Sequence, residues 1–261
     1  MMTFSKINYE VLDTVAVLTL NSPKNLNAFD EAMIDDVLGA LKAAEDDAAI
    51  RAVIIKGNGP AFSAGGDIGF MYKSLKSGQL NFEGEIKKIA QISVNIKKMS
   101  KPVIASVHGA VAGAAFNIAL ACDFCIASDD VKFMQAFVNI GLIPDAGGLY
   151  LLSRAVGVNR AIQLAMTGKP VSAQEANALG FVTKVVERDA LDETSLGMAK
   201  KLAAGPSQSY RHMKALLYQS QFADFEAYIA HEVAAQTACG STKDFAEGIS
   251  AFVEKRKPSF E

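Results

Sequence analysis

Residues 101–148 place the strongest constraint on how this chain can fold. They read KPVIASVHGAVAGAAFNIALACDFCIASDDVKFMQAFVNIGLIPDAGG. An apolar strand at 103–107 leads into a turn of small residues at 109–115, which opens a helix too apolar to face water. A second apolar strand follows at 124–127. The stretch ends in a loop that carries one carboxylate, Asp145, among proline and glycine. These features predict a buried strand–helix–strand unit with an acidic loop beside it.

The remaining sequence alternates strands and helices and then becomes helical throughout. Asp30 and Ser172 stand where N-caps are expected, and a polar segment at 73–82 predicts a connection. We therefore expect an α/β core at residues 1–188 and a helical C-terminal region at residues 189–261. The predicted strands are 7–11, 15–20, 51–56 and 181–186; the predicted core helices are 30–46, 67–72, 85–99, 146–156, 160–168 and 172–179; the C-terminal helices are 191–204, 206–220, 222–238 and 242–255.

Charge and apolar content exclude several classes of partner. The 26 basic and 28 acidic residues nearly balance, with no basic stripe for nucleic acid. The longest apolar run, 107–122, contains His108 and Asn117 and is too short to span a bilayer. The first fifteen residues lack the apolar core of a signal peptide. We expect a cytoplasmic protein that binds neither nucleic acid nor membrane.

Several familiar motifs are missing or incomplete. Cys122 and Cys125 have a CxxC spacing, but no second pair accompanies them, which favours buried thiols over a metal or redox site. His231-Glu232 has no following histidine at zinc-protease spacing. Neither a GxxxxGK[ST] phosphate loop nor a GxSxG nucleophile turn occurs. The sequence therefore predicts no metal site.

Two turns of small residues, 63–66 and 109–115, each follow a strand and open a helix. Backbone N–H groups at a helix start lack intrahelical acceptors, and the helix dipole favours negative charge there. Small side chains let a ligand approach such a backbone closely. One turn alone indicates tight packing; two together can form an oxyanion hole with one amide from each.

The order of motifs resembles the crotonase (enoyl-CoA hydratase/isomerase) superfamily over nearly the whole chain. The segments are SPKNLNAF, GPAFSAGGDI, KPVIASVHGAVAGAAFNIALACD, IGLIPDAGG, GFVTKVV and the closing AFVEKRKPSF. The resemblance implies a spiral of ββα turns with a helical C-terminal region that forms homotrimers or dimers of trimers. It also implies an acyl-CoA thioester substrate, with coenzyme A as part of the substrate and no separate cofactor.

The resemblance assigns roles to particular residues. Ala64 and Ala114 correspond to the amides that bind the thioester oxygen. Ordinary loop packing is the alternative explanation for Leu26 and Ala28. The positions that correspond to contacts with the CoA adenine and pantetheine arm are Lys24, Leu26, Ala28, Gly65, Gly66, Asp67 and Ile68.

Departures from the hydratase pattern indicate the reaction. Hydratases of this family carry glutamates where this chain has Asn117 and Phe137, and neither replacement can titrate. Hydration needs a base for water and an acid for the α-carbon, so their loss argues against efficient hydration. Asn117 is expected either to orient water or substrate or to be a buried amide bonded to backbone. Core packing is the alternative for the bulky residues that are expected to line the acyl pocket, which are Phe70, Met71, Tyr72, Met134, Phe137 and Leu142.

Asp145 occupies a loop position that is acidic in some isomerases of the family. A single carboxylate can move a proton between the α- and γ-carbons of an enoyl thioester, while the oxyanion amides hold the dienolate. An apolar setting would raise its pKa. We therefore predict an enoyl-CoA isomerase with Asp145 as base. The alternatives are an Asp145 that only caps the helix after it, a hydratase, another family reaction such as thioester hydrolysis or dehalogenation, and a non-catalytic acyl-CoA-binding subunit.

Overall fold

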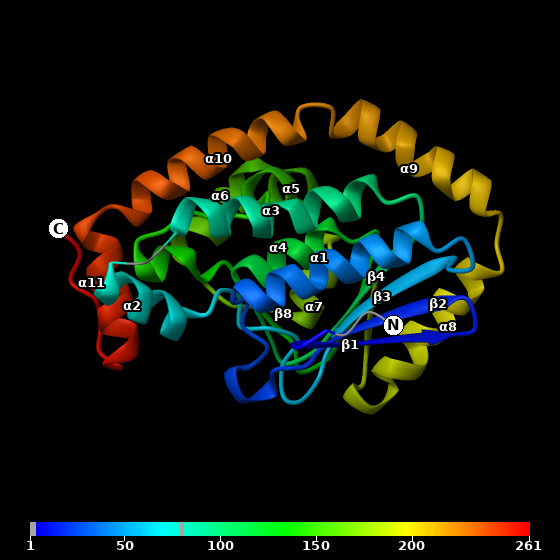
Figure 1. Cartoon of the computed structure of the whole chain (residues 1–261), viewed down its shortest axis with the longest axis horizontal. Helices are drawn as coiled ribbons and strands as arrows, with labels where there is room; N and C mark the ends of the chain where they lie inside the picture. The colour runs from blue at the N-terminus through cyan, green and yellow to red at the C-terminus, as the bar shows by residue number, and fades with distance from the viewer. Residues whose placement is uncertain (1–3, 79–80) are drawn as a thin grey trace.

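A computed structural model describes residues 4–78 and 81–261, and its largest unit is a six-stranded sheet (Figure 1). β1 pairs antiparallel with β2, and every later pair is parallel. Because both faces of a parallel sheet are covered, its inner strands are nearly continuous apolar runs, whereas the two edge strands are more exposed. The strands, in their order across the sheet, are β1 (Ile7–Leu12), β2 (Val15–Leu20), β3 (Ala52–Gly57), β4 (Val103–Val107), β6 (Phe124–Ser128) and β9 (Lys184–Val186).

Three very short strands form a second sheet beside the first. β5 (Ala110–Ala112) pairs parallel with β7 (Lys132–Met134), and β7 pairs antiparallel with β8 (Val171–Ser172). The sequence did not predict these strands, because two or three residues are too few to display a period of two. Their place in the fold matters, since β5 lies within the small-residue turn that opens the buried helix.

Helices cover both faces of the main sheet. α1 (Glu31–Asp46) and α3 (Phe82–Lys98) pack on one face with the buried α4 (Ala114–Ala121), and α8 (Leu191–Ala203) packs on the other (Figure 1). Asp30 accepts a hydrogen bond from the Met33 N–H at 2.9 Å and caps α1, as predicted. The core helices are α1 (Glu31–Asp46), α2 (Ile68–Ser77), α3 (Phe82–Lys98), α4 (Ala114–Ala121), α5 (Gly148–Val156), α6 (Val158–Thr167) and α7 (Ala173–Leu179), with 3-10 helices η1 (Pro23–Asn25), η2 (Ala136–Ile140) and η3 (Arg188–Ala190).

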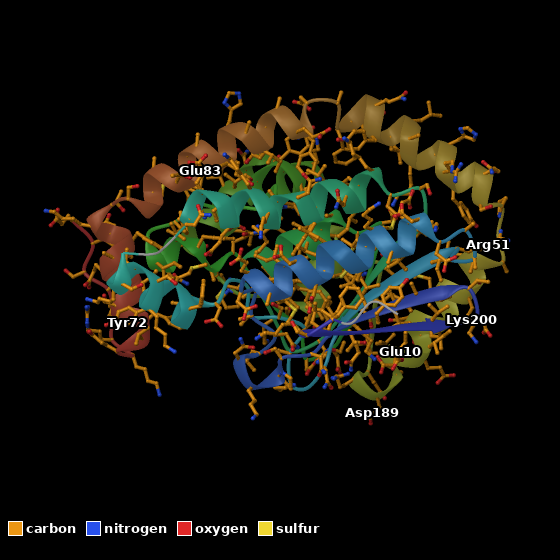
Figure 2. All side chains as sticks on the ribbon, viewed as in Figure 1. Glu10, Arg51, Tyr72, Glu83, Asp189 and Lys200 are labelled. Atoms are coloured by element: carbon orange, nitrogen blue, oxygen red, sulfur yellow. The ribbon has the colours of Figure 1, made fainter. Side chains whose placement is uncertain are left out.

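The chain after β9 is helical, and its helices lie against the core. α9 and α10 follow one another along the outer side of α3, and α11 lies beside α2 (Figure 1). At the opposite end from Tyr72 and Glu83, the Arg51 Nη2 donates to the Gly205 carbonyl at 2.8 Å, which ties β3 to the α8–α9 connection (Figure 2). These helices are α8 (Leu191–Ala203), α9 (Ser207–Gln221), α10 (Phe225–Gly240) and α11 (Lys243–Val253).

The α/β fold class is confirmed, with two local corrections. The helix expected at 67–72 continues to Ser77, and Phe82 already begins α3, so much of the predicted connection at 73–82 is helical. Within it, residues 79–80 lie outside the described part. The strand expected at 181–186 begins only at Lys184. No helix of the described chain is long and apolar enough to cross a membrane.

Asn27 organises the loop between β2 and α1. Its buried side-chain amide donates to the carbonyls of Asn58, Ala61 and Phe62, while its Oδ1 accepts from the Ser22 N–H at 2.8 Å. Its φ is +54°, a left-handed conformation that asparagine adopts more readily than most residues. This one side chain therefore joins the loop at 22–28 to the loop that leads to the first small-residue turn.

We predict that Asn27→Ala lowers the free energy of unfolding by about 3 kcal/mol, because it leaves buried carbonyls and an N–H without partners and places alanine at positive φ. Denaturant unfolding of the wild type and the variant measures this. Asn8→Ala, on an exposed strand position, is the control and should change stability by at most about 0.5 kcal/mol. Equal stabilities for the two variants would contradict the role given to Asn27.

Candidate active site

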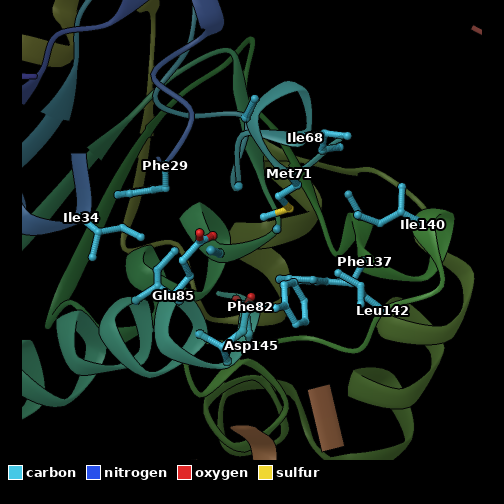
Figure 3. A pocket seen from close by; sticks show the side chains of 17 residues that line it. Phe29, Ile34, Ile68, Met71, Phe82, Glu85, Phe137, Ile140, Leu142 and Asp145 are labelled. Atoms are coloured by element: carbon cyan, nitrogen blue, oxygen red, sulfur yellow. The ribbon is translucent and has the colours of Figure 1, made fainter. Parts of the chain in front are cut away.

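One pocket brings together most of the predicted site (Figure 3). Both turns of small residues and the acidic loop contribute to its wall, through Ala64, Ala114 and Asp145. The rest of the lining is largely apolar and comes from α1, α2, α3 and η2. The other predicted residues that line the pocket are Gly66, Ile68, Phe137 and Leu142, together with Phe29, Ile34, Met71, Phe82, Glu85, Ile86, Ile89, Gly113, Ala136 and Ile140.

The two turns of small residues are pressed against each other. The Ser63 N–H donates to the Ala110 carbonyl and the Ala112 N–H donates to the Ser63 carbonyl, both at 3.1 Å. A Cβ added at Gly65 would lie 2.6 Å from the Ala112 carbonyl oxygen, and Gly65 also has φ +88°. Only glycine fits at that position. The two turns are therefore in direct contact, as an oxyanion hole with one amide from each would require.

The two predicted oxyanion amides differ in their present partners. Ala114 is the first residue of α4, and its N–H donates to no protein acceptor within residues 4–78 and 81–261. The Ala64 N–H donates to the Leu26 carbonyl at 2.9 Å. Leu26 and Asn27 both have positive φ values, +55° and +54°. The Ala114 N–H could therefore donate to a thioester oxygen directly. The Ala64 N–H could do so only after its hydrogen bond to the Leu26 carbonyl breaks.

Asp145 lies in the wall of the pocket with only 6% of its surface exposed. Burial raises the pKa of its carboxyl to about 7, and the nearby Gln236 amide, which favours the charged form, offsets this only in part. The Oδ1 atom is buried and has no hydrogen-bond donor in the described chain. A carboxylate with this pKa is suited to take up and release a proton near neutral pH.

The alternative explanation of Asp145 as a helix cap is wrong. α5 begins at Gly148 rather than at residue 146, its N-cap is Gly147, and no side chain caps it. Asp145 therefore has no capping role that would account for its burial.

Asn117 is a buried amide and contributes nothing to the pocket lining. It is fully buried on α4; its Nδ2 donates to the Asp145 carbonyl oxygen at 2.7 Å, and its Oδ1 accepts from Gln135 Nε2 at 2.7 Å. Of the two uses expected for Asn117, the structure therefore has the buried amide bonded to backbone. Its contribution to the site is to hold the residue that carries the carboxylate.

The residues predicted to contact CoA follow the pocket edge and the loop outside it. Lys24 and Leu26 are exposed, Ala28 is buried, and Gly65, Gly66 and Ile68 belong to the first turn and the start of α2. Asp67 caps α2 by accepting from the Phe70 N–H at 2.9 Å, and its Oδ2 accepts from Asn25 at 3.0 Å. Of the bulky residues considered as pocket walls, Met71 lines the pocket, but Phe70, Tyr72 and Met134 do not.

Glu85 is a pocket residue that the sequence did not single out. It lies in the first turn of α3, where an acid is ordinarily exposed and favoured by the helix dipole. Instead, its half-buried carboxyl faces the pocket that Asp145 also lines (Figure 3). Burial raises the pKa of Glu85, the Glu31 charge raises it further, and Lys88 lowers it. The one feature of the sequence that could have indicated this position is that Glu85 directly precedes Ile86, where the apolar face of α3 continues.

Comparison with known proteins agrees with the geometry. Residues 10–261 match the family model described as enoyl-CoA hydratase/isomerase. The chain is 43% identical over 260 residues, 99% of each protein, to a trans-2-decenoyl-[acyl-carrier-protein] isomerase of Streptococcus mutans. It is 36% identical, again over 99% of each, to a probable enoyl-CoA hydratase of Rhodobacter capsulatus.

A crystal structure of an enoyl-CoA hydratase from Mycobacterium avium subsp. paratuberculosis has a similar fold. It superposes with a TM-score of 0.90 at 30% identity, covering 99% of this chain and 100% of that one. The chain belongs to the enoyl-CoA hydratase/isomerase family, and its fold is that of the crotonase superfamily.

Proposed function

We propose that the protein is an isomerase that shifts the double bond of an unsaturated acyl thioester, with Asp145 as the base. The observation that carries this proposal is one buried carboxylate, with a pKa of about 7, in an apolar pocket that is also lined by Ala114, whose N–H has no acceptor among the described residues. The two hydratase glutamates are replaced by Asn117, which is buried in a hydrogen-bond network, and by Phe137, which is apolar.

The reaction needs two proton transfers and no other reactant. The Asp145 carboxylate removes a proton from the γ-carbon of a 2-enoyl thioester, and the electron pair moves through the double bond to the thioester oxygen. The resulting dienolate is stabilised by N–H donors at that oxygen. Asp145 then returns the proton to the α-carbon, which gives the 3-enoyl thioester; the reverse direction uses the same steps. Because the same carboxyl serves both transfers, one titrating side chain is sufficient.

The oxyanion hole in this proposal forms fully only when the thioester binds. Ala114 supplies one N–H from the start of α4, where the helix dipole favours negative charge. The second comes from Ala64 once the thioester oxygen replaces the Leu26 carbonyl. The positive φ of Leu26 is unfavourable for leucine, so relaxation of that residue when its carbonyl releases Ala64 offsets part of the free energy of the exchange.

The acyl group and its carrier are the finer part of the proposal. Apolar side chains such as Ile86, Ile89 and Ile140 suit an alkyl chain. We favour coenzyme A as the carrier through Lys24, Leu26, Ala28 and the first turn. The Streptococcus relative is named for an acyl-carrier-protein substrate and another relative, of Escherichia coli, for a CoA substrate. Both carriers present the acyl group on a pantetheine arm, and turnover of decenoyl-CoA and decenoyl-carrier protein distinguishes them.

We predict that Asp145→Asn lowers kcat for conversion of 3-decenoyl-CoA to 2-decenoyl-CoA about 10³-fold, since the amide cannot accept the proton. Product formation followed by chromatography measures this, and Asp129→Asn, an exposed aspartate after β6, is the control. Undiminished turnover by Asp145→Asn would exclude Asp145 as the base. If the wild type converts no enoyl thioester but binds one in calorimetry, the non-catalytic alternative holds.

Hydration remains the second candidate, and Glu85 is the observation that favours it. Two carboxyls on one pocket could supply the base and the acid that hydration requires. Glu83, two residues earlier, is exposed and pairs with Lys87 at 2.5 Å, so it offers a matched comparison (Figure 2).

We predict that Glu85→Gln lowers isomerase activity less than tenfold, because Asp145 alone transfers the proton. In a hydratase that uses both carboxyls, the same change should lower crotonyl-CoA hydration at least about 100-fold. Parallel assays of both reactions with the wild type, Glu85→Gln and Glu83→Gln decide between them. Hydration that exceeds isomerisation in the wild type and is lost in Glu85→Gln would overturn the isomerase proposal.

We propose that the protein forms homotrimers or dimers of trimers. The observation in favour is an exposed apolar face on α9 formed by Met213, Leu216 and Leu217, which are 57%, 65% and 55% exposed. Apolar side chains grouped in this way usually mark a protein contact. Light scattering should give three or six times the mass of one chain, and Leu216→Glu should lower it. A wild-type mass equal to one chain would contradict the prediction.

A further inference from the structure

The loop at 143–148, which carries Asp145, has a backbone conformation that needs support from outside. Ala146 and Gly147 have φ values of +51° and +78°, two successive left-handed residues. Alanine is unfavourable in that region and persists there only where neighbouring structure fixes it. Ala146 is fully buried, and a Cβ added at Gly147 would lie 2.5 Å from the Phe225 ring of α10.

Two side chains of α10 hold this loop by its backbone. Gln236 Oε1 accepts from the Ile143 N–H at 2.9 Å, and Glu232 Oε1 accepts from the Gly147 N–H at 2.8 Å. The two residues are four apart, so they lie on the same side of the helix. Their bonds reach the loop on both sides of Asp145. Asn117 holds the Asp145 carbonyl from α4, which completes three fixed points.

The polar side chains that hold the Asp145 loop from α10 are almost completely buried. Gln236 is fully buried and Glu232 is 3% exposed. Within the described chain, Asp145 Oδ1, Glu232 Oε2 and Gln236 Nε2 have no hydrogen-bond partners. The interaction with the Gln236 side chain lowers the pKa of Asp145, against the larger effect of burial. Residues of α10 therefore influence the pKa of the Asp145 carboxyl.

Glu232 is itself a weak acid in this environment. Burial raises its pKa to about 8; the Gly147 N–H lowers it, the Asp145 charge raises it, and the Tyr228 hydroxyl lowers it. Across the pocket, α3 adds Glu85, whereas α4 and η2 contain no titratable residue. α3 also carries Lys87, which pairs with Glu83 on the outside. The charge states of Glu232 and Asp145 are therefore coupled.

We propose that Glu232 and Gln236 are positioning residues for the reaction: they clamp the loop at 143–148 from α10 and hold the Asp145 carboxyl at the pocket in the form that accepts a proton. The inference rests on the proposed function, in which Asp145 is the base. It gives the C-terminal helical region a part in catalysis within its own chain, in addition to any part in assembly.

The first test uses Gln236→Glu, which conserves size and the oxygen that accepts from Ile143. It replaces the amide N–H beside Asp145 with a second carboxyl, which disfavours the Asp145 carboxylate. In a plot of kcat/KM against pH for 3-decenoyl-CoA isomerisation, the wild type should rise through about pH 7. The rise in Gln236→Glu should occur at least half a unit higher, so its rate is roughly threefold lower at pH 6 and recovers at high pH. An unchanged midpoint would overturn the proposal for Gln236.

The second test compares two substitutions of Glu232. Glu232→Leu removes the acceptor of the Gly147 N–H and should lower kcat at least tenfold at every pH, with a smaller change in KM. Glu232→Gln keeps an acceptor oxygen and should recover most of that loss. Glu226→Gln, an exposed glutamate of the same helix that pairs with Lys98, is the control and should match the wild type. Circular dichroism verifies that each variant is folded; should Glu232→Leu not fold, the comparison of Glu232→Gln with Gln236→Glu still decides.

These results separate the two proposals. Full activity of Glu232→Leu together with an unshifted Gln236→Glu profile would overturn the positioning role even where Asp145→Asn is inactive. Full activity of Asp145→Asn would instead overturn the proposed function.

Discussion

The site depends on the close approach of two backbone turns that contain no large side chain. Ser63 is bonded to Ala110 and Ala112 of β5, and Gly65 leaves no room for a Cβ against the Ala112 carbonyl. Backbone groups held this closely cannot move independently, so the start of α4 and the first turn are presented to the pocket as one unit. A larger residue at Gly65 would separate the turns, and the amides of these two distant segments could then no longer meet one ligand atom.

Asp145 lines the same pocket as these two turns, and burial makes the charged form of its carboxyl unfavourable. The affinity of this carboxyl for a proton follows from that burial. Asp145 would be ionised in water at any physiological pH, but in the apolar wall its pKa rises to about 7. The same burial that destabilises the anion makes it a better base, and the three polar contacts to its loop keep it from turning away. Fold and chemistry are thus linked through the placement of one short loop.

Local patterns in the sequence predicted much of this, and distance along the chain explains what they missed. The strand, turn and apolar helix at 103–121 and the Asp145 loop are recognisable because each consists of neighbouring residues. The bond between Gln236 and Ile143 joins residues 93 apart, and that between Glu232 and Gly147 joins residues 85 apart, so no pattern within a window could indicate them. Glu85 was missed because a charged residue in a first helical turn is ordinarily exposed, and its inward direction is set by α3 packing on the core. The hydrogen bond from the Ala64 N–H to the Leu26 carbonyl depends on the conformation of the loop at 22–28. The residue types in that loop do not predict this bond.

The packing around Asn117 also limits how readily such a chain could exchange one reaction for another during evolution. A Cβ added at Gly148 would lie 2.3 Å from Asn117 Nδ2, so this side chain already fills the space up to α5. A glutamate at 117, as in the family's hydratases, would be longer, and it would also lack the N–H that binds the Asp145 carbonyl. Gaining an acid at that position would therefore remove one of the three hydrogen bonds that hold the loop of the existing acid. A substitution at 117 therefore affects the backbone at 145 and the packing at 148 as well, so the three positions form one linked group in this fold.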